Sequence, residues 1–200
     1  MPERLSDRLI RMSEACGSET VTLRRLLPSL SPRDHALMAL FAALCSLPPV
    51  PMPGLSIAFA LTALTAGTRM ALGLEPSLPS RLLDHPLPAR PPARLLAWAA
   101  GALRRAAPLI RPRIDWACAS PRLLRVHGAA IAACGAMLLI PLPPPTNIPP
   151  AGALLLVCLG VLEGDGLVLA AGYLATAAAA AFFVAVAVFG VSGVRALLGF

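Results

Sequence analysis

Hydrophobic residues fill most of this chain in blocks interrupted by prolines and arginines. Four short apolar stretches cover residues 36–47, 54–72, 126–140 and 151–162, and a fifth runs uncharged from 167 to 191. An α-helix rises about 1.5 Å per residue, so each short stretch falls below the roughly 30 Å of a bilayer's hydrocarbon layer. The fifth is long enough for one complete crossing. Its alanine-rich composition also suits a hairpin, so both forms stay open.

Two proline-rich knots separate the short stretches in pairs. The expected helix breaks are Pro48, Pro51, Pro53 and Gly54 in the first knot and Pro141, Pro144, Pro149 and Pro150 in the second. Proline has no backbone N–H and interrupts helices. Inside a membrane, the carbonyl groups freed at such a break need protein or water as partners. We therefore expect both knots to be buried among neighbouring helices.

The two knots recur at equal spacing, because Pro141 follows Pro48 by 93 residues and Pro144 follows Pro51 by 93. Each unit reads as a short helix, a knot and a second short helix. Repeats of broken helices are common in transporters, whose sites lie where the breaks meet. The pattern predicts an all-α, polytopic integral membrane protein with two repeated units of proline-broken helices, re-entrant or short, plus amphipathic interfacial helices.

Polar, arginine-rich segments flank these units. The expected division is 1–33, a cytoplasmic amphipathic segment; 34–73, the first membrane unit; 74–125, a basic cytoplasmic linker; 126–165, the second unit; and 166–200, a C-terminal membrane helix or hairpin. Within the linker, residues 93–107 form an amphipathic pattern with a basic face beside Trp98. Such a face is typical of a helix lying flat on a membrane.

Composition and charge agree with a membrane protein. Hydrophobic residues make up 57% of the 200 residues and charged residues 14%, and a soluble chain of this size could not bury that much apolar surface. All 17 basic residues are arginine, which with the many alanines and prolines is typical of a GC-rich bacterial genome. The arginines lie on both sides of the first unit, which places those flanks in the cytoplasm of an inner-membrane protein, beside anionic lipid. This explains the net charge of +7 better than nucleic-acid binding does.

Four polar residues near the apolar units form the candidate intramembrane site: Arg69, Asn147, Glu163 and Asp165. A charge in lipid is unfavourable and usually marks function with a partner, so we expect Arg69 to pair with Glu163 across the repeat. The alternative is that both reach water at the interface. Asn147 lies inside the second knot, where its amide can bond freed backbone groups.

Other polar residues have simpler interpretations. Thr62, Thr65 and Thr68 recur on one helix, and local bonds to helix carbonyls are favoured over a polar path. His35 and His127 open the two units and are expected at the membrane interface.

The five cysteines lack paired spacing, so they read as small apolar fillers and not as a disulfide or metal framework. Motifs for acyl, phosphoryl or glycosyl transfer are missing, so no catalysis, metal or cofactor is expected.

Several motifs in order resemble the bacterial ExoD family of exopolysaccharide synthesis proteins. The similarity runs from about Leu5 to the last helix, through four stretches: 47–54, 111–116, 140–150 and the Leu-Gly-x-x-Glu-x-Asp-Gly run at 159–166. The chain departs from the family where Arg69 replaces the usual Gln and where Ser77 replaces the Trp of a Trp-Leu-Pro motif. The resemblance implies an integral inner-membrane protein linked to exopolysaccharide production, with no defined reaction.

Two mechanisms follow for such an accessory protein. One is a small secondary transporter or permeation element, with its site where the two broken helices meet. The other is a non-transporting scaffold that holds the proteins of polysaccharide synthesis or export at the membrane. A water-lined cavity would favour transport, and a dry packed junction with an exposed apolar face would favour the scaffold. The small size of the chain favours a homodimer.

Overall fold

The structure is a computed structural model that describes residues 10, 20–22, 34–47, 55–75, 86–88, 101, 120–140 and 144–198. The helices are α3 (Asp34–Ser46), α4 (Leu55–Leu72), α8 (Pro121–Leu138), α9 (Ile148–Glu163) and α10 (Gly166–Leu198), with a 3₁₀ turn η1 (Pro144–Asn147). One short strand pair joins β1 (Thr20–Thr22) to β2 (Pro86–Pro88) in antiparallel register. The expected helices in the N-terminal segment and over 93–107 lie outside the described residues, apart from single positions.

Every apolar stretch of the sequence that the structure describes is helical, as predicted. The end of the second knot is already helical. Pro144 is the first residue of η1, and Pro149 and Pro150 lie in the first turn of α9. A proline in a first helical turn sacrifices no hydrogen bond. The interruption of helix therefore lies between Leu138 and Pro144. Of the other expected breaks, the described residues do not include Pro48, Pro51, Pro53, Gly54 and Pro141.

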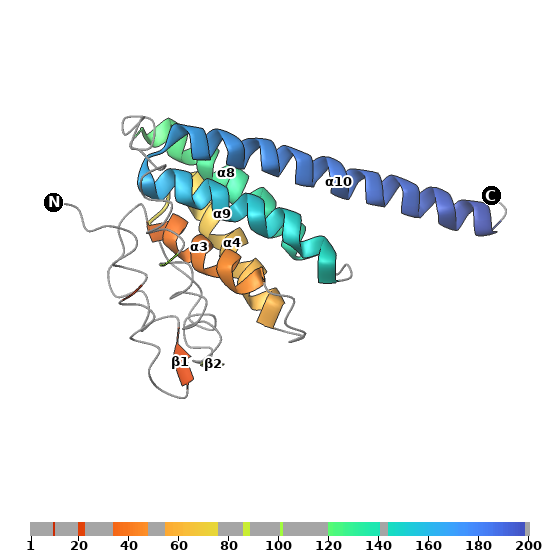
Figure 1. The fold of residues 1–200 in the computed structure, drawn as a ribbon, viewed down its shortest axis with the longest axis horizontal. Helices are drawn as coiled ribbons and strands as arrows, with labels where there is room; N and C mark the ends of the chain where they lie inside the picture. The colour runs from red at the N-terminus through yellow and green to blue at the C-terminus, as the bar shows by residue number, and fades with distance from the viewer. Residues whose placement is uncertain are drawn as a thin grey trace.

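The four shorter helices form two hairpins that turn at the same end of a bundle (Figure 1). The first pairs α3 with α4 and the second pairs α8 with α9. Between the hairpins, α4 packs on α8 and α3 packs on α9. We call the end with the two turns the turn end. The opposite end, which we call the charged end, carries Arg69, Arg122, Arg125, Glu163 and Asp165.

The closest helix contact joins α4 to α8 through glycines. A Cβ built on Gly128 would lie 2.4 Å from the backbone nitrogen of Ala71, and one on Gly67 would lie 2.3 Å from that of Ala132. Gly135 meets Leu64 in the same antiparallel register, at 2.5 Å. Side chains of any size would hold these backbones apart. Gly67, Gly128 and Gly135 thus allow the two helices to approach closely.

A second glycine contact fixes α10 against α9. A Cβ on Gly160 would lie 2.7 Å from the Leu169 backbone, and one on Gly172 would lie 2.7 Å from the nitrogen of Val157. The C-terminal apolar stretch, for which a hairpin was also open, is a single helix of 33 residues. Among the described residues it is the one helix long and apolar enough to cross a membrane, and 22% of its 18-residue apolar window is buried.

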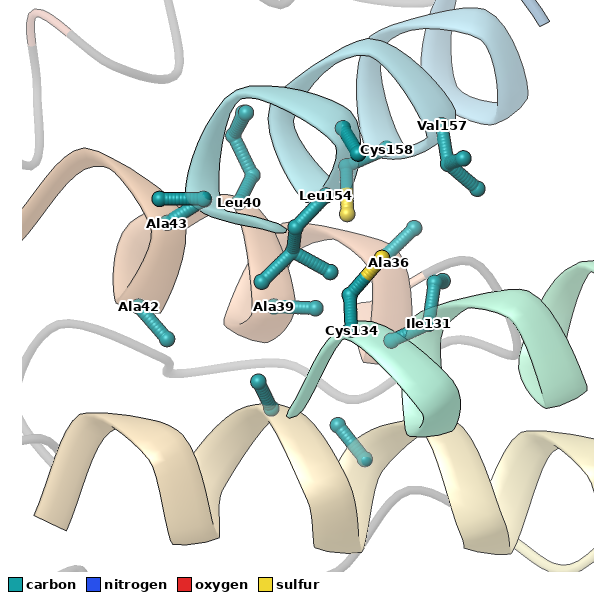
Figure 2. Packing of buried hydrophobic residues seen from close by; sticks show 14 of the residues in the cluster. Ala36, Ala39, Leu40, Ala42, Ala43, Ile131, Cys134, Leu154, Val157 and Cys158 are labelled. Atoms are coloured by element: carbon teal, nitrogen blue, oxygen red, sulfur yellow. The ribbon is translucent and has the colours of Figure 1, made fainter. Parts of the chain in front are cut away.

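Helix α3 lies at the centre of the packed helices. Every side chain from His35 to Leu44 is at most 3% exposed, which agrees with a helix that is apolar all round. Its alanines allow the neighbouring helices to come close, and Ala36 and Ala39 lie beside Leu154 of α9 (Figure 2). The core therefore combines alanines, which let the backbones come close, with large side chains such as Phe41 and Leu154 that fill the space between the helices.

The α4–α8 contact can be tested with Gly128→Ala. The added methyl group would sit 2.4 Å from the Ala71 nitrogen, so the two helices must separate, and we expect a loss of at least about 2 kcal/mol of stability. Gly152→Ala is the matched control, because a Cβ at that position of α9 meets nothing within 4 Å. Thermal unfolding in detergent compares the two variants, and equal melting temperatures would contradict the contact.

Candidate functional site

Arg69 lies in the last turn of α4 and is half-buried. Its Nε donates a hydrogen bond to the carbonyl oxygen of Glu75, at 3.0 Å. Between them, Gly73 takes a left-handed conformation with φ of 70°, which a glycine adopts freely and which ends the helix. The guanidinium thus closes the loop that follows α4. The expected ion pair between Arg69 and Glu163 stays a prediction, although both residues lie at the charged end.

Asp165 has a clear structural role at the start of α10. Its side chain is 1% exposed, and its Oδ1 accepts hydrogen bonds from the backbone N–H groups of Leu167, at 2.8 Å, and Val168, at 3.4 Å. A carboxylate in this position satisfies N–H groups that a helix start leaves open, and it interacts favourably with the helix dipole. The preceding turn at Gly164, with φ of 67°, ends α9. Gly164 and Asp165 thus form the turn between α9 and α10.

Asn147 lies far from the other three residues of the candidate site. It precedes the first residue of α9, whereas Glu163 is the last residue of that helix, so about 24 Å of helix separates them. Its Oδ1 is buried and accepts no hydrogen bond within the described part of the chain, and its side chain does not cap α9. The structure therefore brings Arg69, Glu163 and Asp165 to the charged end and places Asn147 at the turn end.

Two polar contacts between α8 and α10 were not expected from the sequence. The Nδ1 of His127 is hydrogen-bonded to the hydroxyl group of Tyr173, and the Sγ of Cys134 contacts Thr176 Oγ1 at 3.5 Å. His127 and Cys134 are seven residues apart and lie on one face of α8, and Tyr173 and Thr176 are three residues apart and lie on one face of α10. These two spacings could have indicated the contact from the sequence. His35 and His127 are each 2% exposed and lie inside the bundle, near the starts of α3 and α8, so the interfacial position expected for them stays a prediction.

The threonines of α4 serve their own helix, as expected. Thr62 donates to the carbonyl of Ala58 at 2.7 Å, and Thr65 donates to that of Leu61 at 2.7 Å. Thr176 does the same on α10, with Gly172. These hydroxyl groups are satisfied within single helices, so they supply no continuous polar path across the bundle.

The buried cysteines are part of the apolar core. The sulfur atoms of Cys134, from α8, and Cys158, from α9, point into the space between these two helices, next to Leu154 (Figure 2). Both thiols are free. Across the described ranges, no group of three His, Cys, Asp or Glu side chains is placed to hold a metal ion.

Comparison with known proteins decides the family. The profile of the family described as "Exopolysaccharide synthesis, ExoD" matches residues 5–185. The chain belongs to the ExoD family. It is 30% identical over 181 residues to Protein ExoD of Rhizobium meliloti (strain 1021), an alignment that covers 90% of this chain and 75% of the relative. No solved structure matches it. The resemblance carried by the sequence motifs is thereby confirmed.

The buried contact between His127 and Tyr173 can be tested in this ExoD family member by a double-mutant cycle. Tyr173→Phe removes only a hydroxyl group, and we expect a loss of about 1 kcal/mol of stability. His127→Leu removes the hydrogen-bond partner of that hydroxyl group, so it should cost more stability in the wild-type background than in the Tyr173→Phe background. Thermal unfolding measures all four proteins. Strictly additive losses would contradict the hydrogen bond between the two side chains.

Proposed function

We propose that this ExoD family member is a membrane-embedded accessory protein of exopolysaccharide synthesis, and that it acts as a scaffold and not as a transporter. The role in exopolysaccharide synthesis rests on the family description and on the similarity to Protein ExoD. The placement in the membrane and the scaffold mechanism rest on the arrangement of charge and packing in the helices.

The observation that carries the membrane placement is the long uncharged stretch around the turn of each hairpin. The sequence has no Asp, Glu, Lys or Arg between Asp34 and Arg69, and none between Arg125 and Glu163. Each of these stretches includes a whole hairpin turn. The turns of a soluble helical bundle face water and are usually rich in polar and charged residues. Two turns without a charge, at the same end of the bundle, favour lipid or buried protein around that end.

The charged end marks the membrane surface in this proposal. Arg122 and Arg125 are exposed in the first turns of α8, and Arg69 lies at the end of α4. Arginines beside apolar helices face the cytoplasm, so the charged end lies at the cytoplasmic surface of a bacterial inner membrane, where anionic headgroups attract it. The two hairpins then enter from that surface and return to it as a repeated, re-entrant unit.

Packing favours a scaffold over a transporter. The α4–α8 contact, which joins the two hairpins, is a contact of backbone on backbone through Gly67, Gly128 and Gly135. Helices this close leave no room for water between them. The polar residues expected to meet in a transport site lie at opposite ends of α9. The partners of the scaffold are proteins of polysaccharide synthesis or export, and homodimer formation remains a further prediction.

Complementation tests the proposal. The full chain is expressed in a Rhizobium meliloti strain that lacks its Protein ExoD, and secreted exopolysaccharide is weighed. We expect the wild-type chain and Gly152→Ala to restore production, and Gly128→Ala to restore less, because the bundle that presents the scaffold depends on the α4–α8 contact. Failure of the wild-type chain, although it is present in the membrane fraction, would contradict the role in exopolysaccharide synthesis.

A flux measurement separates the two mechanisms within the same role. The purified protein is reconstituted into liposomes and ion leakage is followed with entrapped fluorescent dyes. A scaffold leaves the leakage at the level of liposomes that contain Gly128→Ala or no protein. A protein-dependent leak that Gly128→Ala abolishes would overturn the scaffold mechanism in favour of transport.

A further inference from the structure

Helix α10 is much longer than the bundle on which it packs. Its contacts with α9 are antiparallel, with Gly172 level with Val157 and Leu169 level with Gly160. Ile148, the first residue of α9, lies nine positions before Val157, so the same register places it level with about residue 181 of α10. Figure 1 shows α10 continuing well past the other helices toward the C-terminus. We call residues 184–198 the overhang, which is about 22 Å long.

Burial along α10 stops where this register predicts. Phe183, at 8% exposed, is the last side chain of the described part of α10 that is buried. On the overhang, Val184 is 63% exposed, Val188 56% and Phe189 76%. These side chains belong to the residue types that water disfavours most. More than half of the surface of each of these three side chains is therefore exposed.

The exposed side chains lie all around the helix axis. At about 100° per residue, Phe182 and Phe189 fall on one side, and Val184 and Val188 fall on nearly the opposite side. A single partner helix, including α10 of a second copy, would cover one stripe and leave the other in water. Only a surrounding apolar solvent covers both sides, so the exposure pattern favours the acyl chains of lipids.

Charge sets the length of this apolar helix. No charged residue occurs between Asp165 and Arg195, a stretch about 43 Å long as a helix. A bilayer with its headgroup regions is about 40–45 Å thick. The hairpin helices are shorter, since α3 has 13 residues, α9 has 16, and α4 and α8 have 18 each, or about 20, 24 and 27 Å. A hairpin that starts at the charged end therefore stops short of the far surface.

We propose that α10 alone crosses the bilayer, that lipid acyl chains surround its overhang, and that the C-terminus emerges on the face opposite to the charged end. Asp165 caps the helix at one surface, and position 195, the next charged residue along the chain, falls at the level of the other. The hairpins turn back inside the membrane beside the first half of α10. This inference rests on the membrane placement of the proposed function and adds the side of the C-terminus, the occupant of the exposed surface and the number of complete crossings.

Nitroxide probes test the occupant of the overhang. The ketone-bearing residue p-acetylphenylalanine is placed at position 188 or 189 and labelled, which leaves the native cysteines unchanged. Position 167 is the matched control, because Leu167 is 65% exposed in the first turn of α10 at the charged end. In lipid vesicles, we expect collisions with oxygen to exceed collisions with a water-soluble nickel chelate several-fold at 188 and 189, and the ratio to be several-fold lower at 167.

Two results of this experiment would overturn the proposal. High nickel accessibility at 188 and 189 would place the overhang in water. Shielding from both reagents at one of the two positions would mean that a protein surface, such as a second copy, covers that side.

The side of the C-terminus is tested on the full chain. Two reporters are used: alkaline phosphatase is active only outside the cytoplasm, and green fluorescent protein fluoresces inside it. Each reporter is fused either after Phe200 or before Met1. We expect an active phosphatase at the C-terminus and a fluorescent protein at the N-terminus. Both ends on one side would overturn the single crossing. If a carbonate wash removes the protein from membranes, the membrane placement of the proposed function fails. If the protein stays in the membrane after the wash but both of its ends lie on one side, this inference alone is refuted.

Discussion

The backbone contact between α4 and α8 is the interaction on which the bundle depends. Gly67, Gly128 and Gly135 let the two helices approach until their backbones touch. In lipid, apolar side chains gain little by leaving the solvent, so helices associate mainly through close packing and hydrogen bonds. This contact joins the second helix of one hairpin to the first helix of the other. Without it, the contact of α3 with α9 would have to hold the two hairpins together.

The remaining packing follows from the same use of small residues. Alanines on α3 allow it to sit among its neighbours, and Gly160 and Gly172 bring α10 onto α9. Polar groups then fix direction and register: Asp165 caps α10, and His127 binds Tyr173 across the α8–α10 contact. In the four shorter helices, the charged residues lie at the charged end. The proposed membrane placement rests on that asymmetry.

The helices and their ends could be predicted from the sequence, because proline, glycine and charge mark them directly. The turn at Gly164 and the local bonds of Thr62 and Thr65 follow from neighbouring residues alone. The neighbours of each helix could not be predicted, since helices made of alanine and leucine have no distinct polar face to indicate direction. For that reason Tyr173, the partner of His127, was missed. Asn147 was grouped with Glu163 because both looked polar among apolar residues, although a full helix separates them.

Hydrogen exchange of the protein in lipid nanodiscs tests the α4–α8 contact most directly. Mass spectrometry follows peptides that cover residues 55–75, 120–140 and 184–198. We predict that the amides near Gly67 and Gly128 exchange last and lose protection together in Gly128→Ala, while the overhang, protected by lipid and its own helix, changes little. Fast exchange around Gly67 and Gly128 in the wild-type protein, or unchanged protection in Gly128→Ala, would contradict the account.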